Sequence, residues 1–137
     1  MKKIALFLAL LFCAMLLVSC DAPGVTVLDS LFPPLTDTTT GYTVVTEIRV
    51  TKLITGETVS FTEPVEINNF HLRLEGIKCI RDKKFDEIQP LYNIAFFTAD
   101  GIDSFDVCTE KDYIVGEYHY EAMRSGIDMM YLEGLFS

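Results

Sequence analysis

The sequence predicts an α+β fold: a small antiparallel sheet of about five to six strands built from hairpins, with one helix between strands 2 and 3 and a short C-terminal helix. Three observations predict it. Residues 42–53 alternate apolar and polar side chains, as in a half-buried strand. Residues 62–76 carry start and stop signals of a helix. Asp100-Gly101 is typical of a hairpin turn, because Asp-Gly tolerates positive φ.

The first hairpin is expected to pair residues 42–53 with residues 58–61 across a turn at Gly56. A helix should follow, because Thr62-Glu63-Pro64 offers a hydroxyl cap, an early acid and an early proline. Gly76 is a natural stop. The stretch 70–75 also alternates like a strand, but the presence of both helix signals favours the helix.

The second half of the sequence predicts the rest of the sheet. Residues 91–98 are apolar on both faces, which indicates a central strand. The last strand region is expected at 113–115 and 116–122, with a break at Gly116 left open, and Asp128 is expected to cap the final helix. The expected segments are a strand at 77–81, a charged loop at 82–90, strands at 91–98 and 102–109, a turn at 110–112, strand from 113 to 122, and a helix at 129–135.

The first twenty residues are typical of an export signal. Lys2 and Lys3 give a positive start, and residues 4–18 contain no charged side chain. That apolar run has 15 residues, whereas a membrane-spanning helix needs about 20. Leu17-Val18-Ser19-Cys20 then resembles the lipobox of bacterial lipoproteins.

This resemblance implies cleavage between Ser19 and Cys20 and attachment of a diacylglyceryl group to the Cys20 sulfur. The expected organisation is a signal peptide at 1–19, a lipidated N-terminus and tether at 20–41, and one α+β domain at 42–137. The tether is expected from its prolines and threonines, although its apolar residues leave open that part of it docks as a strand or a helical turn. The domain would then be held to the cell membrane by lipid, facing outside the cytoplasm.

Charge narrows the classes of partner. Without Lys2 and Lys3, nine of the 11 basic residues remain against 20 acidic ones, which gives a net charge of −11. Nucleic-acid binding needs clustered Lys and Arg side chains that neutralise phosphates, so an acidic domain disfavours it. The same negative charge opposes lying flat on an anionic membrane. No cofactor is expected.

The segment 117–121 holds the most suggestive side chains. In a strand, Glu117, His119 and Glu121 would share one face, and Tyr118 and Tyr120 the other. Two carboxylates beside an imidazole are suited to a divalent metal or to tuning a base. The alternative is a solvent-facing polar side with the tyrosines packed inward.

Cys79 and Cys108 are the remaining mature cysteines. A disulfide between them would suit an exported chain. Two buried free thiols are the alternative, because both cysteines lie in expected strands beside apolar residues.

Together these observations predict a non-enzymatic lipoprotein whose sheet binds a protein, a peptide or an envelope component. The alternative is a lipoprotein that binds a metal or small ligand through Glu117, His119 and Glu121. An enzyme of the cell envelope is the third hypothesis.

Overall fold

A computed structural model of the chain describes residues 25–35, 41, 43–82 and 88–137. The expected signal peptide, its cleavage site and Cys20 lie outside these residues. Within the described part, no helix is long and apolar enough to cross a membrane.

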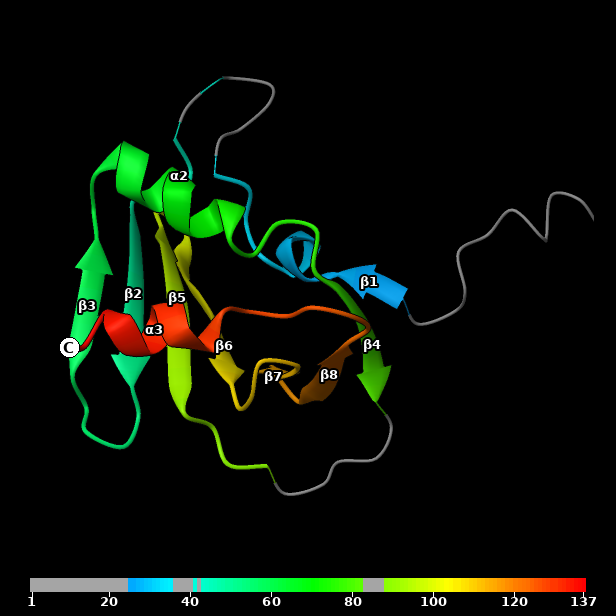
Figure 1. Cartoon of the computed structure of the whole chain (residues 1–137). Helices are drawn as coiled ribbons and strands as arrows, with labels where there is room; N and C mark the ends of the chain where they lie inside the picture. Colours follow the sequence, from blue (N-terminus) through cyan, green and yellow to red (C-terminus); the bar gives the residue numbers. More distant parts are fainter. Residues whose placement is uncertain (1–24, 36–40, 42, 83–87) are drawn as a thin grey trace, which may run out of the picture.

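Over the described residues the fold is α+β, as predicted, but the antiparallel sheet has eight strands and not five to six. The strand order is β1-β4-β8-β7-β6-β5-β2-β3, so β1 and β3 are the two edges (Figure 1). The strands are β1 (Val25–Val27), β2 (Glu47–Lys52), β3 (Thr58–Phe61), β4 (Lys78–Asp82), β5 (Tyr92–Thr98), β6 (Gly101–Val107), β7 (Asp112–Val115) and β8 (Tyr118–Ala122).

The expected tether is wrong for residues 25–35, which belong to the folded domain. β1 pairs with β4, and the 3-10 helix η1 (Leu28–Leu31) follows it. The Leu28 side chain is fully buried, and its backbone N–H donates to the Ile77 carbonyl at 2.8 Å. Phe32 stacks between Phe96 and Phe105, with ring centroids 4.9 and 4.7 Å away. The segment instead docks as a strand and a helical turn, which is the alternative that the sequence left open. Burial of its apolar side chains offsets the entropy cost of ordering it.

The helix α2 (Pro64–Leu72) confirms the prediction for the middle of the chain. Its N-cap residue is Glu63, and no side chain caps it, so the hydroxyl cap expected from Thr62 is not formed. Ile67 and Phe70 are buried, and the Phe70 ring lies 5.3 Å from that of Phe61 on β3. Helix α2 therefore covers the β3 end of the sheet.

The short C-terminal helix α3 (Met129–Gly134) is also as predicted. The Asp128 carboxylate caps it by accepting the backbone N–H of Tyr131 at 3.2 Å. The Tyr113 hydroxyl binds the segment before α3, since it donates to the Glu110 carbonyl and accepts the Ile127 N–H at 2.8 Å. These contacts bring the C-terminal segment back onto the sheet.

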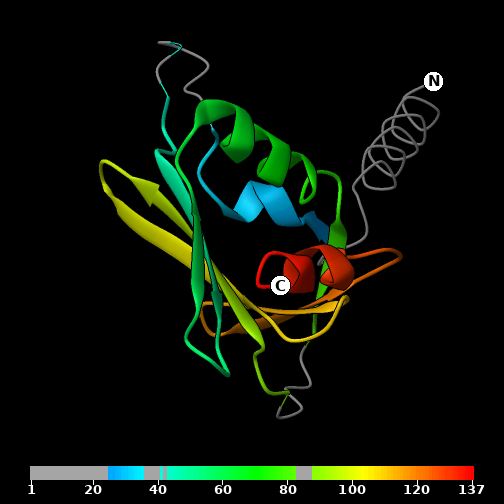
Figure 2. The same ribbon diagram turned by 60° about the vertical axis from the view of Figure 1, so that its left-hand side comes forward.

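The two faces of the curved sheet differ in what covers them. The helices η1, α2 and α3 lie on its concave side (Figure 2). This side carries most of the buried side chains of the sheet, and alternate residues of each strand face the opposite side. The buried side chains on the concave side are Ile48, Val50, Cys79, Ile94, Phe96, Phe105, Val107, Tyr113, Tyr120 and Ala122. The other side of the sheet, which we call the outer face, carries the alternate residues.

Candidate binding face and the Asp112 network

The outer face is polar over most of β2, β3, β5 and β6. Register places Arg49 opposite Ser60 and Ala95, and Ala95 opposite Ser104. Ser60 and Ser104 are exposed, and Ile102, which lies on the same face of β6 as Ser104, is 61% exposed. An antiparallel sheet with one packed and one solvated face gives this alternation. The outer face is thus a broad surface with both hydrogen-bonding groups and apolar side chains.

Two side-chain contacts order the middle of this surface. The Arg49 guanidinium forms an ion pair with Glu47 at 2.9 Å and lies 4.5 Å from the centre of the Phe97 ring. The Asn93 amide donates to the Asp106 carboxylate at 2.9 Å. Both pairs hold polar groups in fixed positions before any partner arrives, which lowers the entropy cost of binding.

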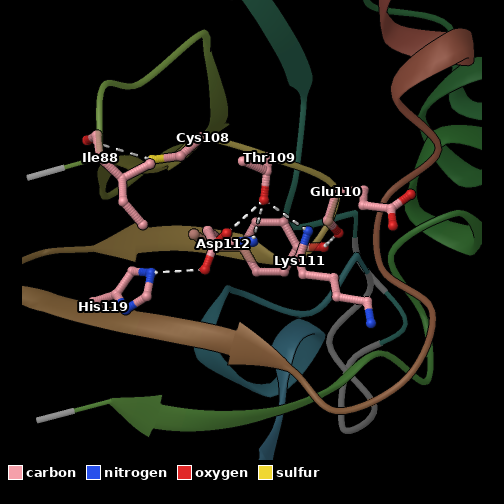
Figure 3. A network of polar contacts seen from close by, with 8 residues as sticks. Ile88, Cys108, Thr109, Glu110, Lys111, Asp112 and His119 are labelled. Carbon is pink, nitrogen blue, oxygen red and sulfur yellow. Dashed lines mark hydrogen bonds and ion pairs between the residues drawn. The ribbon is translucent and has the colours of Figure 1, made fainter. Parts of the chain in front are cut away.

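A network around Asp112 fixes the corner between β6, β7 and β8 (Figure 3). The Asp112 carboxylate accepts the Thr109 hydroxyl at 2.6 Å and the His119 Nε2–H at 3.1 Å. The Thr109 hydroxyl in turn accepts the backbone N–H groups of Lys111 and Asp112 at 3.2 and 3.1 Å. The backbone N–H of Cys108 donates to the Asp112 carbonyl at 2.9 Å. The turn expected at residues 110–112 is therefore held by side chains as well as by backbone.

The order of groups in this network decides what it can do chemically. In a catalytic triad the imidazole lies between the nucleophile and the carboxylate. Here the Asp112 carboxylate lies between the Thr109 hydroxyl and the His119 ring. The carboxylate therefore orients both groups, and the hydroxyl is not placed against the imidazole. This arrangement stabilises a corner of the sheet.

The structure separates the three residues expected to share a strand face. His119 and Glu121 do share the outer face of β8, but Glu117 lies in the turn before the strand. His119 is 5% exposed and hydrogen-bonds Asp112, whereas Glu117 and Glu121 are exposed. Among the described residues, no three His, Cys, Asp or Glu side chains come together as a metal site would require. The strand alternation from which one shared face was expected does not extend to Glu117, because β8 begins only after it.

The tyrosines of this segment differ from each other. Tyr120 packs inward and is 9% exposed, as the alternative reading expected. Tyr118 is 51% exposed, and the Arg81 guanidinium lies 4.5 Å from the centre of its ring. His119 departs from that reading, since it is buried and does not face solvent.

Cys79 and Cys108 are both buried as free thiols, so the disulfide does not form in this structure. Cys79 lies on β4 and Cys108 directly after β6, with β8 and β7 between them. Three strand spacings amount to about 14 Å along the sheet, whereas bridged cysteines have Cα atoms within about 7 Å. Their Sγ atoms instead approach the carbonyls of Ile77 at 3.9 Å and Ile88 at 4.0 Å.

Burial keeps both thiols protonated at neutral pH. Loss of solvation raises the pKa of Cys79 from 9.0 to about 11. The pKa of Cys108 also rises to about 11, first through burial and then through the negative charges of Asp106 and Asp112. A thiol with a raised pKa is a poor nucleophile, because the thiolate is the reactive form.

A second polar cluster joins α3 to the sheet. Lys52 forms an ion pair with Glu133 at 2.6 Å, and the Tyr92 hydroxyl donates to the same carboxylate. Burial, followed by the hydrogen bond and charge of Glu133, raises the pKa of Tyr92 to about 12. The hydrogen bonds from Lys52 and Tyr92 lower the pKa of Glu133. This cluster anchors the helix and is not placed on the outer face.

Two surface hollows lie at the opposite end of the sheet. One is lined by Ile80, Arg81, Lys111, Glu121, Ala122 and Met123, and the other by Gly76, Lys78, Met123, Arg124 and Ser125. Four of the nine bases expected in the mature chain line them: Lys78, Arg81, Lys111 and Arg124. Sequence reasoning missed this grouping, because the bases come from three separate segments and form no run.

Comparison with known protein families, curated proteins and solved structures finds no match to this chain.

Proposed function

We propose that the protein is a membrane-anchored lipoprotein that faces outside the cytoplasm and acts by binding a protein, a peptide or an envelope component. The support for the anchor is the sequence: the positive start, the uncharged run at 4–18, and the lipobox-like Leu17-Val18-Ser19-Cys20. Lipid on Cys20 would hold the chain to the membrane, since each buried methylene contributes about 0.8 kcal/mol.

The observation that best supports a binding role is the set of exposed side chains on the outer face of the sheet. All the described helices lie on the concave side, so among the described residues no helix covers the outer-face side chains of β2, β3 and β6, and these are open to a partner. Exposed Ser60, Ser104 and Ile102 provide the mixture of polar and apolar groups found at protein interfaces. The Asp112 network supports binding over catalysis, because its carboxylate separates the hydroxyl from the imidazole.

The anchor is tested by Cys20→Ser in cells. Radiolabelled fatty acid should appear on the parent protein and be absent from the variant, because the serine hydroxyl cannot form the thioether. The variant should also leave the membrane fraction or accumulate as an uncut precursor. Equal labelling and equal membrane retention of the two proteins would refute the anchor.

The binding role is tested in the same cells by photo-cross-linking amino acids placed at Ser60 and Ser104. A matched control position is Val65, which is 71% exposed but lies on α2, away from the outer face. We expect the same partner to be recovered from the two serine positions and not from Val65. The purified partner should then bind the domain, and Ile102→Glu should weaken that binding at least about tenfold by burying a charge in the interface. Recovery from Val65 alone would refute the outer face.

A further inference from the structure

We propose that the β1 end of the sheet docks on the anionic head groups of the membrane that holds Cys20. The docking surface, which we call the basic edge, consists of Val25, Lys78, Ile80, Lys111, Met123 and Arg124. The proposal rests on the proposed lipid anchor and adds to it an orientation of the domain and a lipid class.

The residues of the basic edge are neighbours in space. Val25 of β1 is the register partner of Ile80 on β4. The backbone N–H of Met123 donates to the Lys78 carbonyl at 2.9 Å, and that of Ala122 to the Lys111 carbonyl at 2.7 Å. Met123 lines both surface hollows and therefore joins them into one surface.

The length of chain between the anchor and the sheet places this edge close to the membrane. Only four residues, 21–24, separate Cys20 from Val25. Five residue steps span at most about 18 Å when fully extended. A tether of 20 residues would let the domain move freely above the head groups, but here the ordered domain begins almost at the lipid. β1 is also the terminal strand of the sheet, so the edge that carries it is the part nearest the anchor.

The charge of this edge is opposite to that of the domain as a whole. Lys78, Lys111 and Arg124 are exposed, and none of them forms an ion pair with a described residue. By contrast, Arg49 and Lys52 at the far side of the sheet are each paired with a glutamate. Glu121 is the one carboxylate that lines the two hollows, and the exposed Glu110 precedes Lys111 in the chain. Each basic residue near an anionic membrane surface strengthens the attraction about fivefold.

The apolar residues of the edge suit the same partner. Ile80 is 43% exposed and Met123 is 47% exposed, so both side chains can contact a partner. Apolar side chains among bases are the pattern by which proteins lie in the boundary between head groups and acyl chains. The net charge of −11 expected after processing would repel the rest of the domain from the anionic membrane. We therefore expect the domain to contact the membrane through its basic edge.

Tryptophan reporters test this orientation, because the chain has no tryptophan of its own. The mature chain is coupled through the Cys20 thiol to a maleimide phospholipid in vesicles. These vesicles contain about 30 mol % phosphatidylglycerol together with bromine-labelled lipid. Met123→Trp reports from the basic edge. Ile102→Trp is the control reporter, because Ile102 is 61% exposed on the outer face of β6. We expect bromine to quench the fluorescence of Met123→Trp and to leave that of Ile102→Trp unchanged.

Charge reversal supplies the second arm. Adding Lys78→Glu and Arg124→Glu to Met123→Trp should lower the ratio of docked to undocked protein at least about 30-fold, from the loss of two bases near the surface. The charge-matched control, Arg49→Glu with Ser60→Glu and Ser104→Glu, makes the domain more negative by the same amount at outer-face positions away from the basic edge and should keep the quenching. Vesicles of phosphatidylcholine alone should quench Met123→Trp much less.

The outcomes separate this proposal from the anchor. Because coupling at Cys20 is chemical, the vesicle result does not depend on whether cells acylate that cysteine; fatty-acid labelling in cells tests the anchor by itself. Absent quenching of Met123→Trp on anionic vesicles, or equal quenching of the two reporters, would overturn the docking. Equal quenching on neutral vesicles would overturn the role of anionic lipid.

Discussion

At Gly126 the backbone passes so close to the turn after β6 that no side chain fits. A Cβ atom there would overlap the Glu110 carbonyl oxygen and the Tyr113 hydroxyl and would lie 2.8 Å from the Glu110 carbonyl carbon. The sequence predicts only a turn at Ser125-Gly126. The close approach depends on residues 13 and 16 positions earlier in the chain, so only the folded structure reveals why the residue is glycine.

Gly126→Ala should therefore lower the free energy of unfolding by at least about 2 kcal/mol, because backbone atoms cannot move aside as a flexible side chain can. Gly134→Ala is the matched control, since a Cβ at Gly134 has no atom within 4 Å and should leave stability unchanged or slightly higher. Urea denaturation of the soluble chain from residue 21, followed by circular dichroism, measures both. Equal midpoints for the two variants would show that the contact at Gly126 is not close.

At the scale of elements, β1 and η1 show that residues 25–31, which the sequence predicts to be part of a tether, belong to the folded domain. Pro33, Pro34 and the threonines after them are typical of a linker. This composition predicts a tether even though the segment also contains apolar residues. A three-residue strand gives too short a pattern to be recognised by alternation. It forms because β4 offers an unpaired edge and because Leu28 and Phe32 fill the core beneath it.

Leu28→Ala should cost about 2–5 kcal/mol of unfolding free energy, and Phe32→Ala about 3–5 kcal/mol, because each removes a buried side chain and leaves a cavity. Val65→Ala removes an apolar side chain that is 71% exposed on α2 and should cost less than about 0.5 kcal/mol. Chemical denaturation of the same soluble chain compares the three. If Leu28→Ala and Phe32→Ala were as stable as Val65→Ala, residues 25–35 would be a tether after all.

The hairpins and α2 illustrate what local patterns predict well. Residues 58–61 and 91–98, and the turns at Gly56 and Gly101, lie within a residue or two of their expected places, because turn chemistry and alternation are local properties. Glu117 illustrates the opposite case. The sequence predicts strand on both sides of Val115, over 113–115 and 116–122, but Gly116 takes φ 61° and the chain turns through Glu117 before β8 begins.

For the whole molecule, buried groups that lose a proton only at high pH make stability depend on pH. Cys79 and Cys108 have pKa values raised from 9.0 to about 11, and that of Tyr92 is raised from 10.0 to about 12. The folded state thus holds these protons at a pH where the unfolded chain has released them. Their contribution to stability is complete below pH 9 and is lost as pH rises toward 11 and 12.

The urea midpoint of the soluble chain should accordingly fall steadily between pH 9 and pH 11. Replacing both thiols, Cys79→Ala with Cys108→Ala, should make this decline shallower, whatever its effect on stability at pH 7. The parent protein should also react slowly with a thiol reagent at pH 7.5 and expose two thiols per chain in denaturant. A flat pH profile, or rapid labelling of the folded protein, would contradict burial of these groups.

The sequence by itself determined the α+β class and most hairpins, and it predicts the export signal and the lipid anchor, because all of these depend on composition, alternation and turn residues that are close together in the chain. Tertiary structure alone decided that the sheet has eight strands, that residues 25–35 are folded, that the two thiols stay apart, and that His119 is buried beside Asp112. It also brought Lys78, Lys111 and Arg124 to one edge. The physical reason is the same in each case: pairing between distant strands and burial of side chains from separate segments are set by the fold as a whole and leave no local pattern.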